Sequence, residues 1–201
     1  MVKTDDIHKL LVQLKDIIDY YSEYGTLFWG HVGLEDLKGL PTRRVIALND
    51  YICALADIEN ATTFIKESND THMDKIDVLA KLETRIKDIV MDNISADDIV
   101  HGLHKDVACL EKEIGEICGD EIFYYETSSN FRELIQKKMW VLERYFSVDA
   151  NQLAEIESRL ARADKALKNA QLEITQECSE VEKPFPPRPS YTPECYWWYI
   201  P

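Results

Sequence analysis

Three histidines of this chain stand three residues from a carboxylate or from one another. Asp5 precedes His8, and Asp98, His101 and His104 follow one another at the same spacing. Three residues make nearly one helical turn, so in a helix each set lies on one face. Metal centres inside helical bundles use carboxylates and imidazoles placed in this way. The pattern therefore defines one hypothesis, a metalloenzyme built on these five residues.

The same residues have a simpler interpretation as parts of helix starts. Asp5 and Asp98 fall near the beginnings of expected helices, where Asp is favoured as a cap or in the first turn. Ser95 and Asp98 have the spacing of a capping box. Asp is also shorter than the Glu that such metal centres use, and two further inward-facing acids are not evident. We therefore expect neither a metal nor another cofactor.

The cysteines and the glycines do not match the motifs of common active sites. There is no CxxC pair, so finger-type zinc sites are disfavoured. The sequence also lacks GxxxxGK[ST], GxGxxG, GxSxG and HExxH. We therefore do not expect an enzyme. The five cysteines are widely spaced and odd in number: Cys53, Cys109, Cys118, Cys178 and Cys195.

The cellular location follows from the cysteines and the apolar runs. An odd number of scattered cysteines is not typical of a disulfide framework. The N-terminal residues are not followed by an apolar signal region. No apolar run approaches the roughly 18 residues that a membrane span needs. We expect a cytoplasmic protein that does not enter a membrane.

The last 18 residues, 184–201, form a proline-rich tail that ends in consecutive aromatic side chains. Six of the seven prolines lie there, which favours an extended conformation. Tyr196, Trp197, Trp198 and Tyr199 follow one another near the end. Trp and Tyr often dominate the binding energy of interfaces. We expect the tail to dock on its own chain, on a second copy, or in a pocket of another protein.

Residues 149–183 predict a long helix with a coiled-coil pattern. Apolar residues recur at alternating spacings of three and four without a Gly or Pro between them. Asp149 can cap the start, and the residue before Pro184 marks the end. The heptad seam consists of Leu153, Ile156, Leu160, Ala163, Leu167, Ala170 and Ile174. One exposed apolar stripe is unstable in water, so this helix must pack on the rest of the chain or on a second copy.

Apolar residues at helical spacing predict five further helices in the first part of the chain. Residues 120–129 have some strand character but no partner strand, so we expect an extended connector there. Residues 25–41 hold four of the seven glycines together with Phe28 and Trp29. This segment either folds back over the core or forms a binding loop. The predicted helices span residues 4–24, 42–67, 72–92, 96–118 and 130–146.

The formal net charge is −14, and most of it lies in the first half. Residues 1–100 hold 19 acidic and 11 basic side chains, which gives −8; residues 101–148 and 149–201 each give −3. A negative surface repels phosphates, so direct nucleic-acid binding is disfavoured. The charge would suit a basic partner. This is the basis of a second hypothesis, an acidic inhibitor in the basic groove of a nucleic-acid-handling protein.

Together these patterns predict an all-α protein with an extended tail. We expect an acidic bundle of about five helices over residues 1–148, the long helix over 149–183, and the aromatic tail over 184–201. The function that we favour is a non-catalytic protein-interaction or assembly module, in which a protein partner or a second copy contacts the heptad seam, the tail or the loop with Phe28 and Trp29.

Overall fold

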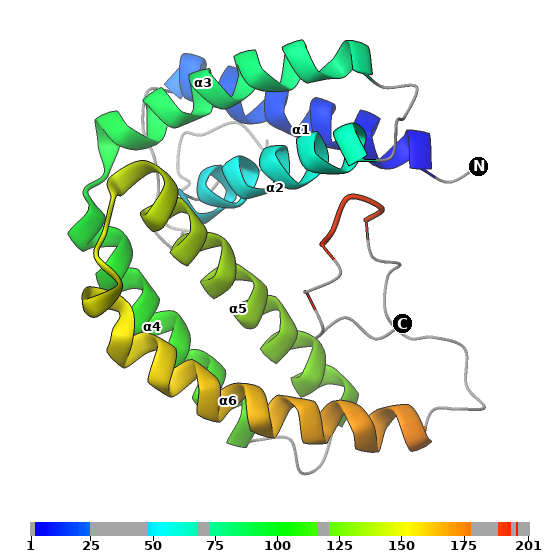
Figure 1. The fold of residues 1–201 in the computed structure, drawn as a ribbon, viewed down its shortest axis with the longest axis vertical. Helices are drawn as coiled ribbons and strands as arrows, with labels where there is room; N and C mark the ends of the chain where they lie inside the picture. Colours follow the sequence, from blue (N-terminus) through cyan, green and yellow to red (C-terminus); the bar gives the residue numbers. More distant parts are fainter. Residues whose placement is uncertain are drawn as a thin grey trace. The chain divides into compact units, whose positions relative to one another are not determined.

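The computed structural model describes residues 3–24, 48–67, 73–115, 121–177, 189–193 and 196. All regular structure in these ranges is helical, which confirms the all-α fold class (Figure 1). None of the described helices is long and apolar enough to cross a membrane. The helices are α1 (Lys3–Tyr24), α2 (Leu48–Glu67), a 3-10 turn (Met73–Lys75), α3 (Ile76–Asn93), α4 (Ala96–Gly115), α5 (Glu121–Val141), a π-helical segment (Leu142–Phe146) and α6 (Ala150–Glu177).

Contacts divide the chain into two compact units of three helices each. The first comprises Met1–Ile94 with Pro189–Thr192 and contains α1, α2 and α3. The second comprises Ser95–Arg188 with Pro193–Pro201 and contains α4, α5 and α6. The segments predicted at 1–148, 149–183 and 184–201 follow changes in composition along the chain, whereas these two units follow contacts in space.

In the first unit, consecutive helices run in opposite directions (Figure 1). Helix α1 contacts both α2 and α3, and its buried side chains recur at the helical period. Two hydroxyl contacts add to this packing. The Tyr51 hydroxyl on α2 donates to the Ile17 carbonyl on α1 over 3.1 Å, and Asn93 Nδ2 on α3 donates to the Tyr21 hydroxyl over 3.1 Å. Burial raises the pKa of Tyr51, so this hydroxyl keeps its proton and remains a donor.

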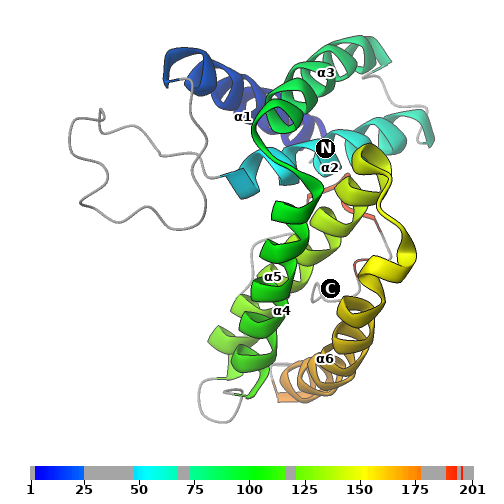
Figure 2. The ribbon, with the colours of Figure 1, turned by 90° about the vertical axis from the view of Figure 1, so that its left-hand side faces the viewer.

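In the second unit, α4, α5 and α6 also alternate in direction, and each contacts the other two (Figure 2). Helix α6 turns its heptad seam inward. The six seam residues from Leu153 to Ala170 are all buried, while the Ile174 side chain lies outside the described residues. The long helix therefore packs against α4 and α5 of its own chain, one of the two arrangements that the sequence allowed.

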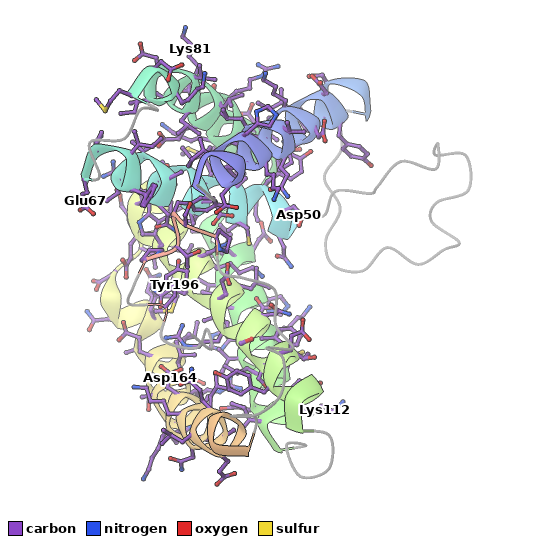
Figure 3. All side chains as sticks on the ribbon, turned by 90° about the vertical axis from the view of Figure 1, so that its right-hand side faces the viewer. Asp50, Glu67, Lys81, Lys112, Asp164 and Tyr196 are labelled. Atoms are coloured by element: carbon purple, nitrogen blue, oxygen red, sulfur yellow. The ribbon has the colours of Figure 1, made fainter. Side chains whose placement is uncertain are left out.

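Each pair of helices in the second unit is joined by an ion pair. Lys138 Nζ on α5 lies 2.5 Å from Asp106 Oδ2 on α4. Arg132 on α5 reaches Asp164 on α6 through two hydrogen bonds, of 2.6 Å and 3.2 Å. Figure 3 labels Asp164 on α6.

A third ion pair between helices of this unit connects α4 and α6. Arg159 on α6 donates to both carboxylate oxygens of Glu111 on α4, over 2.6 Å and 3.1 Å. The three ion pairs therefore connect α4, α5 and α6 to one another in every pairing.

Two helix starts have the caps that the sequence predicts. The Ser95 N–H donates to Asp98 Oδ2 over 3.0 Å, and the Asp98 N–H donates to Ser95 Oγ over 3.3 Å, so the capping box of α4 is confirmed. The Ser95 hydroxyl also donates to Asp98 Oδ2 over 2.6 Å, and this hydrogen bond, together with the one from the Ser95 N–H, lowers the pKa of Asp98. At α6, Asp149 Oδ1 accepts a hydrogen bond of 2.9 Å from the Asn151 N–H, which confirms Asp149 as the cap.

The extended connector predicted at residues 120–129 is wrong. Helix α5 begins at Glu121 and continues through these residues without a break. Aromatic and β-branched side chains there favour a strand locally, but tertiary packing overrides that preference. Tyr125 is 1% exposed, because α5 lies against both α4 and α6. The predicted second and fourth helices, 42–67 and 96–118, agree with α2 and α4 where residues are described, and their remaining ends lie outside the described ranges.

Helix α5 ends in a π-helical segment that turns the chain toward α6. Ser147 follows this segment with φ 51°, the one positive φ at a non-glycine position among the described residues. This left-handed conformation is the usual way to end a helix, but glycine adopts it more easily than serine. The Val148 N–H then donates to the Leu142 carbonyl over 3.4 Å, which closes the turn before α6 begins.

Candidate interaction site at the C-terminal tail

Part of the tail forms a compact turn that we call the docked turn, Pro189–Thr192. The Thr192 N–H donates to the Pro189 carbonyl over 3.0 Å, which is the hydrogen bond of a β-turn. A second turn follows, in which the Tyr196 N–H donates to the Pro193 carbonyl over 3.1 Å. Both turns begin at a proline, which has no N–H and offers only its carbonyl.

The docked turn lies against the beginning of α1 in the first unit (red in Figure 1). The Ser190 backbone N–H donates to Asp6 Oδ2 over 2.9 Å, and Asp6 is half-buried. Asp6 lies in the first turn of α1, where the free N–H groups of the helix favour a negative side chain. One carboxylate therefore serves both the helix start and the tail.

The side chains of the docked turn fit closely on the protein. The four residues are all half-buried. The Ser190 hydroxyl oxygen is buried and has no hydrogen-bond partner among the described residues. Among the described residues, the polar contact of Ser190 is therefore the hydrogen bond from its main-chain N–H to Asp6. Recognition of Ser190 therefore depends on its N–H rather than on its side-chain oxygen.

Tyr196 is the one member of the aromatic cluster that the structure describes. It is 7% exposed and is grouped with the second unit (Figure 3). Trp197, Trp198 and Tyr199 lie outside the described residues, as do Phe28 and Trp29. Of the predicted partner-binding residues that can be placed, Tyr196 and four seam residues are therefore buried within the chain: Leu153, Ile156, Leu160 and Leu167.

Some of the metal-site candidates have other roles, and the candidates are divided between the first and the second unit. His8 is exposed on α1 of the first unit, and the Asp5 side chain lies outside the described residues. Asp98 belongs to the α4 capping box, beside an exposed His101 and a half-buried His104. Within the described ranges, no three or more His, Cys, Asp or Glu side chains are close enough to hold a metal ion.

The exposed surface of α3 carries charges of both signs. Asp77, Asp88 and Asp92 are exposed there together with Lys81 and Arg85, and Lys81 points away from the helices in Figure 3. Alternating signs weaken the field that a basic groove would sense. This helix therefore gives no specific support to the acidic-inhibitor hypothesis.

Sequence reasoning did not find the two residues that hold the tail. Asp6 lies at the start of the helix predicted over residues 4–24, where an acidic residue is expected for the helix alone, and Ser190 has no distinctive sequence context beyond its prolines. The two lie 184 positions apart, so no local pattern could join them. The buried cations of α5 were also missed, although the lack of a clear apolar stripe in that helix was a usable signal.

Comparison of the chain with protein-family models, with curated proteins and with solved structures finds no match.

Proposed function

We propose that this protein is a non-catalytic assembly module that binds a protein partner through its aromatic C-terminal tail. The observation that carries the proposal is the docked turn. A non-helical segment from the far end of the chain lies on α1 and is held there by a main-chain hydrogen bond to Asp6. A tail that uses main-chain groups and aromatic side chains to dock on a helical surface is suited to contact other proteins as well.

The helical units support a scaffold role. In the second unit, two buried cations of α5 pair with other helices: Arg132 with Asp164 on α6 and Lys138 with Asp106 on α4. The third, Lys137, pairs with Glu133 on α5 itself. The heptad seam is also used inside the chain, so its residues are not part of the proposed partner surface. In the described ranges, Cys53 and Cys109 form no disulfide, which is consistent with the cytoplasmic location that we propose.

The partner surface is best sought at the end of the tail. Trp197, Trp198 and Tyr199 follow the buried Tyr196 directly. Large aromatic side chains gain affinity by filling apolar pockets from which water is excluded. The partner that fits this tail presents such a pocket beside main-chain acceptors for the indole N–H groups.

The test compares the full-length chain with the double variant Trp197→Ser, Trp198→Ser. Both are immobilised, and the proteins retained from an extract of the source cells are quantified by mass spectrometry. The matched control is Leu172→Ser, which removes an apolar side chain that is 60% exposed on α6, outside the tail. We expect the double variant to lose retained proteins that the control keeps. Identical retention by all three chains, with no second copy of the chain among the retained proteins, contradicts the proposal.

A further inference from the structure

We draw no further inference here: the strongest candidate, the exposed basic face that Arg162, Lys165 and Lys168 form on α6 of the second unit, carries nothing because nothing in the structure shows what covers it.

Discussion

The ion pair between Lys138 and Asp106 permits a test of the free-energy cost of a buried charge that has lost its partner. The Lys138 side chain is 2% exposed and that of Asp106 is 14% exposed. Burial raises the pKa of Asp106 even though Lys138 acts in the opposite direction. Ionising this carboxyl inside the folded unit therefore costs more free energy than the attraction to Lys138 returns.

The substitutions to compare are Lys138→Met and Asp106→Asn. Lys138→Met leaves a buried carboxylate without its counter-charge, which we expect to lower the free energy of unfolding by about 3–5 kcal/mol at neutral pH. Asp106→Asn leaves the Lys138 ammonium, which is 2% exposed, without its counter-charge, so we expect a loss of similar size. The double variant Asp106→Leu, Lys138→Met should be neutral, or more stable by about 1–4 kcal/mol.

The free energy of unfolding should also depend on pH through Asp106. Between the ordinary pKa of Asp and its raised value in the folded state, the folded state binds more protons than the unfolded state. The free energy of unfolding from this group therefore falls as pH rises through that window. The loss caused by Lys138→Met should be complete at neutral pH and should shrink as pH falls toward about 4.

Urea denaturation followed by circular dichroism at several pH values measures these quantities. The linear extrapolation gives a free energy of unfolding for each variant. A loss of under about 1 kcal/mol in either single variant at neutral pH would refute the cost of an unpaired buried charge. So would a deficit of Lys138→Met that grows on acidification.

Three further predictions concern stability, and each is measured in the same way. Ser147→Gly relieves the left-handed backbone conformation and should stabilise by about 0.5–1 kcal/mol; a loss would show that the Ser147 side chain has an unrecognised role. Glu111→Gln should cost under about 1 kcal/mol at neutral pH, since the hydrogen bond from Arg159 lowers the pKa of Glu111. That contribution is present above the ordinary Glu pKa and is lost as pH falls through the lowered value, so a cost that persists at pH 2 would contradict it. Leu160→Glu places a charge in the core and should cost at least about 3 kcal/mol; a folded variant that changed only its oligomeric state would contradict the packing of α6 within its own chain.

The sequence predicted those parts of the fold that have a strong local signal. The heptad seam from Leu153 to Ala170 is buried as a continuous stripe. The capping box of Ser95 and Asp98 and the cap at Asp149 follow from side-chain chemistry within a few residues of each helix start. Periodicity and caps depend on neighbours in sequence, so they can be recognised without the structure.

Helix α5 was only partly predictable, because its environment is supplied by other helices. Arg132 and Lys138 occupy buried positions that would be apolar in an ordinary amphipathic helix. Their partners, Asp164 and Asp106, each lie 32 residues away. The first turns of α5 contain aromatic and β-branched residues that favour a strand locally. Helical structure there results from packing between α4 and α6, which the local sequence does not encode.

The candidate site depends on contacts at long range. The aromatic cluster of the tail could be recognised from composition alone. The docking of the tail on Asp6 could not, because a main-chain N–H to carboxylate contact leaves no pattern in the sequence.

The most direct measurement of the central claim is photo-crosslinking from within the aromatic cluster. Trp198 is replaced by p-benzoylphenylalanine in the full-length chain, and the same residue at position 172 on α6 serves as the control. We predict that irradiation joins the position-198 chain to a second polypeptide and gives a product heavier than 23.3 kDa, which the position-172 chain does not form. Crosslinks from position 198 that remain within one chain, in purified protein and in extract alike, would contradict a tail that binds a protein partner.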